Sequence, residues 1–448
     1  MTGAKKTPDV YLSNFAQLEK RRGRNGDSWL NSLRNDAIAR FTELGFPTTK
    51  LEDWKFTNVA PITKIPFQIA EPGHDGLTAD RLAHMPFADT AFCEQCSRIV
   101  FVDGHYSREL SSPDMARGIT VMSLAEAIER DAPSLKAHLA RHASFDRQAF
   151  VALNTAFLDD GAFVEISRGV ALEQPIYLLF VSTAREPIAS HPRSLVIVGE
   201  HSQAAIIEDY VGLEDGVYFT NAVTEIVAGE NSVVEHYKLQ DESPAAFHVA
   251  TVQAHQARSS SFTSHSTSFG GALVRNDVNV VLDGEGAQCT LNGLYVTADN
   301  QHVDNHTIID HVKPHGVSRE LYKGILNDKS SAVFNGSIVV RKDAQKTDAR
   351  QSNKNLLLSE EATINSKPQL EINADDVKCT HGTSIGHPDD DSIYYLRSRG
   401  IGEDEAQSVL TYGFADDVLN KMKIAGLRVR LECALLSRLS SRRTHTEG

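Results

Sequence analysis

The sequence predicts a mainly β protein, built as a parallel β-helix (solenoid) with helical regions at both ends. Three observations lead to this fold class. From about Gly161 onward, short runs of Val, Ile, Leu, Phe and Thr alternate with Gly, Asn, Asp and Ser for over two hundred residues. Within that stretch, a turn-and-strand signature returns with a period of roughly 30 residues. Apolar residues at helical spacing precede and follow it.

The repeat distinguishes a solenoid from other β folds. It appears as GEHSQAAIIEDY at 199, GENSVVEHYKL at 229 and GEGAQCTLNGLY at 284, with looser copies KPHGVSRELYKGI at 313 and KDAQKTDARQSN at 342. Such a period suits one coil of two or three strands, each stacked on the equivalent strand of the next coil. A pair of β-sandwiches is the alternative, but sandwiches show hairpin turns every ~8–12 residues without a longer period.

The N-terminal region, residues 1–160, is predicted to be mixed and largely helical, with a small β element. Apolar residues recur at spacings of three and four within the helical stretch from 10 to about 58, and Gly45 and Pro47 end that pattern. The segment SRIVFVDGHYS at 97–107 contains an Asp-Gly pair, which favours a hairpin turn. Residues 121–160 return to a helical pattern that Pro133 interrupts.

The β-helix is expected over residues 161–395 and a C-terminal helical domain over 396–448. Glu403, Asp404 and Glu405 favour a helix N-terminus, and a second helix is expected from near Asp416. That helix has two apolar stripes on nearly opposite sides, formed by Val418, Met422, Ala425, Val429, Cys433 and Leu436 and by Ile424, Leu427, Leu431 and Leu435.

Two explanations of the two stripes stay open. Either Gly426 breaks the helix and both halves pack on this chain, or one face binds a partner protein. A solenoid also needs its ends protected, because a terminal coil exposes unpaired strand edges. Helices at both ends could provide such caps.

Composition narrows the classes of function. The formal net charge of -14 argues against a nucleic-acid partner, since it repels a phosphate backbone. No apolar run is long enough for a membrane span, and MTGAKKTPDV does not resemble a signal peptide, so a cytoplasmic location is expected. Five cysteines in 448 residues predict reduced thiols rather than a disulfide framework.

The main candidate site lies where the β-rich region gives way to the C-terminal helices. If Val377 to Thr383 is extended, Cys379 and His381 project from the same strand face. A thiol and an imidazole are ligands for iron or zinc, and Lys378 could help to keep the thiol ionised. Since a closed tetrahedral site takes four ligands, the pair is predicted to be either half of a site completed by another chain or a relay point for sulfur or iron. A buried cysteine beside a hydrogen-bonded histidine is the alternative.

Other candidate residues are weaker. Cys93 and Cys96 form a CxxC without a second pair, and are expected to be incidental thiols. A row of histidines on a predicted strand could hold a metal, although solvated side chains are the simpler expectation; it comprises His302, Asp304 and His306, followed by His311 and His315. Cys289 and Cys433 are both expected to be core residues.

Several segments resemble a known family. They are VFNG at Val333–Gly336, AQKTDARQSNKNLLL at Ala344–Leu358, KPQLEI at Lys367–Ile372, ADDVKCTHG at Ala374–Gly382 and YLRSRGI at Tyr395–Ile401. With EDWKFT at Glu52–Thr57, these segments make the sequence similar to the SufB/SufD family of the SUF iron-sulfur cluster assembly machinery, on the SufD side of that family. The resemblance is specific over about residues 190–440 and weaker before them.

The resemblance implies a right-handed β-helix that pairs with SufB, while the C-terminal helices dock the ATPase SufC. It assigns SufC binding to Ser398, Arg399, Gly400, Ile401 and Phe414. Cys379 and His381 would lie at the SufB interface and support a transient nascent iron-sulfur cluster, with a further link to iron supply. No cofactor is expected to be stably bound by this chain alone, and a homodimer is a further expected state of the isolated chain.

The predicted function is therefore that of a non-catalytic scaffold subunit. The sequence has no GxxxxGK[ST] loop for phosphates, which agrees with ATP hydrolysis by SufC. A purely structural adaptor that ligates neither iron nor sulfur is the alternative. A solenoid polysaccharide-active enzyme is disfavoured, because Asp375 and Asp376 are adjacent and so face opposite sides of a strand.

Overall fold

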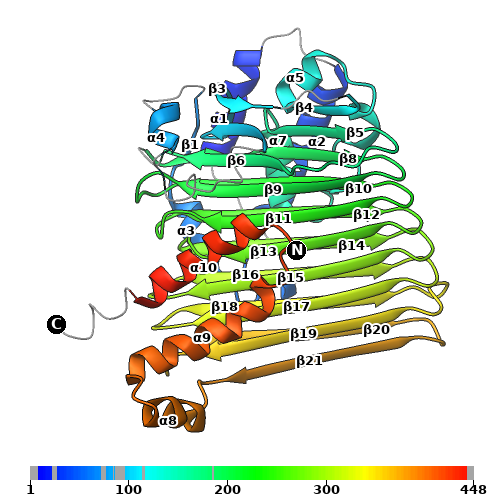
Figure 1. Cartoon of the computed structure of the whole chain (residues 1–448). Helices are drawn as coiled ribbons and strands as arrows, with labels where there is room; N and C mark the ends of the chain where they lie inside the picture. The colour runs from blue at the N-terminus through cyan, green and yellow to red at the C-terminus, as the bar shows by residue number, and fades with distance from the viewer. Residues whose placement is uncertain are drawn as a thin grey trace.

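The computed structural model shows a parallel β-solenoid of about eight turns, with helices along its sides (Figure 1). The structure describes residues 9–22, 28–71, 77–83, 85, 96–113, 117–183 and 186–440. The fold class predicted from the repeat is confirmed: each regular coil has two strands, one in each of two facing sheets. None of the helices in these ranges is long and apolar enough to cross a bilayer.

The two sheets contain alternate strands of the chain. Sheet A consists mainly of β4 (Ile119–Ser123), β5 (Ala162–Ile166), β8 (Arg193–Val198), β10 (Phe219–Ala228), β12 (Phe247–Gln256), β14 (Leu273–Leu282), β16 (His302–His311), β18 (Ser331–Val340) and β20 (Thr363–Ile372), and the short β1 (Gln68–Ile69) and β7 (Ile188–Ser190) join it. Sheet B consists of β2 (Ser97–Val102), β3 (His105–Ser112), β6 (Ile176–Ser182), β9 (Gln203–Gly212), β11 (Val233–Asp241), β13 (Ser261–Ser268), β15 (Gln288–Thr297), β17 (Val317–Leu326), β19 (Asp348–Leu357) and β21 (Lys378–Gly386).

The sequence repeat corresponds to one corner of the coil. One residue per coil at this corner has a positive φ, as the copies at His201, Asn231 and His315 show. Its backbone N–H donates to a carbonyl of the next coil, for example from Asn231 to Arg258 at 2.9 Å. Left-handed backbone is tolerated best by Gly, Asn and Asp, which is why polar and glycine-rich turns mark the period.

Strand alternation divides the side chains between the solenoid interior and its outer faces. Between the sheets, aliphatic and aromatic side chains stack coil upon coil, as in the column of Ala204, Val234, Phe262 and Cys289. Cys289 is thus a core residue, as expected, and burial raises the pKa of its thiol well above 9. A one-residue shift of any strand would exchange its inner and outer faces.

The N-terminal region covers the outer face of sheet A and the first coils. Its helices and turns are α1 (Asp9–Arg22), α2 (Ser28–Leu44), η1 (Glu52–Trp54), α3 (Ala60–Lys64), α4 (Ala79–Ala83), α5 (Leu124–Glu129), α6 (Leu135–His138) and α7 (Ala149–Ala156). Aromatic side chains of α1, α2 and α7 pack against Phe219 and Phe247 on the outer face of sheet A. Strands β2 to β4 extend both sheets at this end, so the solenoid is covered there.

Of two local predictions for the N-terminal region, one is right and the other is wrong. The hairpin is confirmed: β2 and β3 are antiparallel, and Asp103 and Gly104 both have positive φ in the turn. The helical prediction for 121–160 is wrong at its start, because Val121 and Met122 belong to β4, which pairs with β5. Pairing with β5 outweighs the helical spacing of a short segment.

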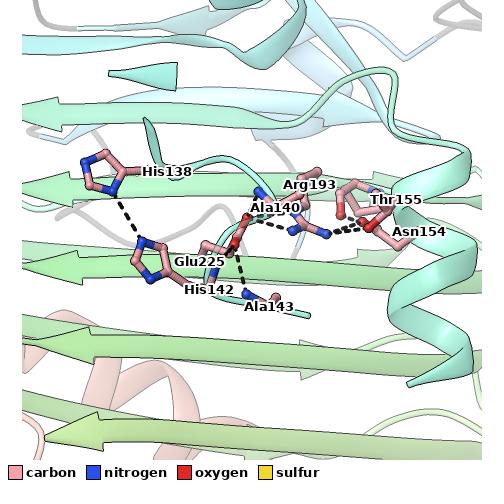
Figure 2. Close-up of polar contacts among 9 residues, drawn as sticks. His138, Ala140, His142, Ala143, Asn154, Thr155, Arg193 and Glu225 are labelled. Atoms are coloured by element: carbon pink, nitrogen blue, oxygen red, sulfur yellow. Dashed lines mark hydrogen bonds and ion pairs between the residues drawn. The ribbon is translucent and has the colours of Figure 1, made fainter. Parts of the chain in front are cut away.

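A buried ion pair joins the α6–α7 loop to the solenoid (Figure 2). Arg193 of β8 donates to Glu225 of β10 at 2.7 Å, and neither side chain is exposed at all. The two carboxylate oxygens of Glu225 also accept backbone N–H groups of Ala140, His142 and Ala143 at 2.7–2.9 Å. Arg193 holds the pKa of the Glu225 carboxyl low despite its burial. One carboxylate thus fixes a loop from another part of the chain.

The C-terminal helices do not cap the solenoid. After β21, α8 (Asp390–Ser398) turns the chain, and α9 (Glu403–Leu419) and α10 (Ala425–Ser440) run back along the outer face of sheet B (Figure 1). The suggestion that they protect the terminal coil is wrong, because Leu427, Leu431 and Leu435 are buried against the outward residues of sheet B instead. The helices therefore lie along sheet B, where their apolar residues pack on its apolar outer face.

The helix boundary also differs from the prediction. Asp416 lies inside α9. The helical structure is interrupted at residues 420–424, before Gly426. The Leu427 stripe is buried, whereas Val429, Cys433 and Leu436 on the other stripe are exposed. The prediction that Cys433 is a core residue is therefore wrong.

Candidate site at the open end of the solenoid

Cys379 and His381 lie on the last coil of the solenoid, on the strand β21. Both side chains are on the inward face, because Cys379 pairs in register with Ala349 and His381 pairs with Gln351. Cys379 is half-buried against the interior apolar column, and His381 is exposed. The side chains of a strand alternate between its two faces, so residues 379 and 381 share one face, as predicted.

The surroundings of Cys379 favour the protonated form of its thiol. Burial raises the pKa of Cys379 above its usual value of 9, and the nearby Asp348 carboxylate raises it further. The expectation that Lys378 keeps the thiol ionised is wrong in direction, because Lys378 points to the opposite face of the strand. A metal that binds this sulfur must therefore displace a proton.

The end of the solenoid that carries this pair is open. Within the described residues, β20 and β21 are the last strands of their sheets, so each has one edge to which no described strand is paired. Most of their residues are exposed, and among them are the large apolar side chains of Ile372 and Ile385. An uncapped edge with free backbone N–H and C=O groups is a template for pairing with another chain.

Polar side chains fill the interior just behind the open end. Asn353 accepts a hydrogen bond from Ser366 at 2.7 Å and another from Asn355 at 2.7 Å. Ser366 is 3.0 Å from the hydroxyl of Thr383, which shares the inward face of β21 with His381. The interior of the final coils is therefore partly polar, as it is in earlier coils, where the Lys238 ammonium donates to Asn276 at 2.9 Å. This signal lies at alternate positions of the AQKTDARQSNKNLLL segment, but the sequence pattern alone did not single it out.

The donor set at the open end is incomplete as a metal site. In the ranges that the structure describes, no group of three or more His, Cys, Asp or Glu side chains is arranged to hold a metal ion. Cys379 and His381 supply one sulfur and one nitrogen, both of which bind iron. The arrangement can therefore donate two ligands to an iron species whose other ligands come from elsewhere.

The five residues expected to bind a partner divide into two places. Ser398 is the last residue of α8, and Arg399, Gly400 and Ile401 follow in the turn to α9; all but Ile401 are exposed. Phe414 lies on α9, where its ring is 4.3 Å from the Lys323 ammonium of β17.

The turn forms part of a larger aromatic surface that the sequence did not indicate. Tyr394 and Tyr395 of α8 are 75% and 56% exposed, and the Arg399 guanidinium lies 5.0 Å from the Tyr395 ring. We call Tyr394, Tyr395 and the turn 398–401 the α8–α9 corner. Exposed Tyr and Arg side chains are typical of the centres of protein interfaces.

The remaining sequence candidates are not brought to this site. Cys93 lies outside the described residues, and Cys96 is buried beside sheet B. His302 and Asp304 are neither solvated nor set up for a metal; both contact Thr57 of the N-terminal EDWKFT segment, with His302 Nε2 at 2.9 Å. Further on, His311 is buried and 2.9 Å from Ser318, and His315 occupies a corner turn.

The EDWKFT segment crosses the outer face of sheet A. Arg275 of β14 lies 4.4 Å from the Trp54 ring and donates to the Asp53 carbonyl at 2.9 Å. Arg275 also pairs with Asp304 at 2.6 Å, and it holds the pKa of that carboxyl low. The predicted histidine row is thus the anchor of an N-terminal segment.

The fold places the chain among the parallel β-solenoid proteins, and its open end with a thiol and an imidazole distinguishes it from a capped solenoid. Comparison with known proteins agrees. Residues 180–414 match the SufBD core domain of the SUF system for FeS cluster assembly, and residues 5–178 match the SufBD N-terminal region. The chain belongs to the SufBD family.

Relatives with established names cover nearly the whole chain. The iron-sulfur cluster assembly SufBD family protein of Synechocystis is 33% identical over 90% of each chain. The iron-sulfur cluster assembly protein SufD of Escherichia coli is 32% identical over 90% of this chain and 91% of the relative. SufD of Bacillus subtilis is 26% identical over 94% and 95%. The family is one of iron-sulfur cluster assembly.

Proposed function

We propose that this chain is a non-catalytic scaffold subunit that donates Cys379 and His381 to a nascent iron-sulfur cluster or to the iron that supplies it. The observation that carries the proposal is the position of this pair on the last coil of an open-ended solenoid. Two donors cannot enclose an iron species, so the cluster is cargo that a partner also ligates. The membership of the SufBD family supports this assignment.

The partner at the open end is proposed to be SufB, through pairing of the two solenoids. The free edges of β20 and β21 offer backbone hydrogen bonds, and Ile372 and Ile385 offer apolar area. The same edges support a homodimer of the isolated chain. The polar interior behind them favours an interface that encloses water and ions rather than a dry core.

Cys379→Ala or His381→Ala is expected to lower cluster formation in cells at least tenfold while the complex with SufB and SufC stays intact. Each change removes a donor without disturbing the strand pairing of β21. The measurement is anaerobic iron and sulfide analysis of the co-purified complex, together with the activity of cluster-dependent enzymes.

Matched controls separate loss of a donor from loss of any thiol or imidazole. Cys433→Ser alters an exposed thiol on α10, and His387→Asn alters an exposed histidine just beyond β21. Both controls should retain normal cluster content. Normal cluster content in the Cys379 and His381 variants would contradict the donor role and leave the structural adaptor as the function.

The α8–α9 corner is proposed to dock SufC. Arg399→Asp is expected to reduce co-purification of SufC by at least tenfold, because it reverses a charge beside the exposed Tyr395 ring. Co-purification of SufB should not change. A point variant is preferable to removal of α9 and α10, since removal would expose the buried face of sheet B.

Lys329→Asp is the control for this charge reversal. Lys329 is an exposed residue in a turn between β17 and β18, and it does not belong to the corner. Undiminished SufC binding by the Arg399 variant would remove the corner from the docking surface.

A further inference from the structure

A column of three polar side chains leads from the solenoid interior to His381. Glu320 of β17 pairs in register with Gln351 of β19, and Gln351 pairs with His381 of β21. All three occupy inward positions of sheet B, and neighbouring strands of a sheet lie about 4.8 Å apart. Gln351 is therefore the inward residue that lies directly behind His381.

The amide nitrogen of Gln351 is hydrogen-bonded, whereas its amide oxygen has no partner in the described part of the chain. Its Nε2 donates to Glu320 Oε2 at 2.6 Å. Its Oε1 has no hydrogen-bond partner among the residues that the structure describes, although Gln351 is only 3% exposed. A buried acceptor without a partner destabilises the folded chain, because it has lost its hydrogen bonds to water. Such a group signals a partner that arrives in another state of the molecule.

Gly336 provides the space for this amide. A Cβ atom at Gly336 of β18 would lie 2.2 Å from Gln351 Nε2, which is far inside contact distance. The glycine of the VFNG segment thus lets the amide extend across the interior towards sheet A. The orientation of Gln351 is therefore determined from two sides, by Glu320 and by the space at Gly336.

We propose that Gln351 is the positioning residue of His381, whose ring N–H it accepts at Oε1. The imidazole ring is exposed and has no hydrogen bond within the described part of the chain, so it is free to turn onto this acceptor. Accepting one ring N–H selects a single tautomer and leaves the other nitrogen available to a metal. The inference deepens the proposed function, on whose donor role for His381 it rests.

The test compares Gln351→Met with the wild type in the isolated full-length chain. Methionine has a similar length but no amide acceptor. With ¹⁵N-labelled histidine, His381 should occupy one tautomer in the wild type and a mixture in the variant. The affinity of the chain for Co²⁺ should fall about 10- to 100-fold in the variant, as is usual when the group that orients a ligand is lost.

Asn353→Leu is the matched control. Asn353 lies two residues further along β19, at the same inward depth, but pairs in register with Thr383. It should leave the His381 tautomer unchanged. Gly336→Ala is a second test, since it displaces the Gln351 amide without changing any member of the column, and it should reproduce the Gln351→Met result.

The results of the Gln351 test can be distinguished from those of the His381→Ala test of the donor function. Identical tautomer populations and Co²⁺ affinities in wild type, Gln351→Met and Gly336→Ala would overturn the positioning role. If instead the tautomer changes while cluster formation survives His381→Ala, the positioning stands and the proposed donor function fails.

Discussion

Replacing Arg193 by methionine is expected to lower the free energy of unfolding by about 3–5 kcal/mol. The change leaves the Glu225 carboxylate fully buried and without its cation (Figure 2). Its three backbone N–H donors from the α6–α7 loop remain, but they do not neutralise the charge. The measurement is the midpoint of denaturant unfolding.

An exposed ion pair in the turns after β5 and β8 provides the comparison. Arg168 and Glu200 are 3.1 Å apart and largely exposed, so Arg168→Met should cost less than about 1 kcal/mol. The Arg193 variant should also make the loop at 139–148 more susceptible to proteolysis, because that loop loses its anchor. Equal midpoints for the two variants would contradict the account of the buried pair.

Replacing Glu320 by glutamine is expected to stabilise the protein by about 3 kcal/mol at pH 8. Burial between the sheets raises the pKa of Glu320 from 4.5 to about 7. Between these values the folded state binds more protons than the unfolded state, so stability falls as pH rises. The destabilisation caused by ionising the buried Glu320 carboxyl is therefore absent below pH 4.5 and reaches its full value above pH 7.

The expected signature is the pH dependence rather than the stability at one pH. The difference in free energy of unfolding between the variant and the wild type should grow from near zero at pH 4.5 to its full value by pH 8. Glutamine keeps an acceptor for the Gln351 amide, so the packing of the column is retained. A difference that does not vary with pH would show that the Glu320 carboxyl does not titrate in this range. Glu230→Gln, at a partly exposed residue, should show no such trend.

Local sequence patterns predicted the repeated coil and the placement of the site on one strand face. The coil is recognisable because every turn repeats the same corner chemistry, and alternation alone puts Cys379 and His381 on the same side of β21. Such features depend on residues close together in the chain. The family resemblance supplied the expected partners, which no local pattern contains.

Features that depend on distant contacts were not predictable. His302, in the histidine row at 302–306, binds the N-terminal EDWKFT segment through Thr57, which lies 245 positions earlier in the chain. The capping role expected of the C-terminal helices is wrong for a similar reason, since they pack on apolar residues of sheet B that are distant in the sequence. Exposure of Cys433 follows from that placement.

The course of α10 along sheet B has a mechanical consequence. Three ion pairs join this end of the chain to early coils, linking Lys423 to Glu235, Arg430 to Asp209 and Arg438 to Asp241. Lys323 of β17 also pairs with Asp417 of α9, so a load applied to the two helices is shared by β9, β11 and β17. None of these four ion pairs involves β21, so the helices are held to the solenoid by contacts separate from the strand that aligns Cys379 and His381 with the neighbouring coil.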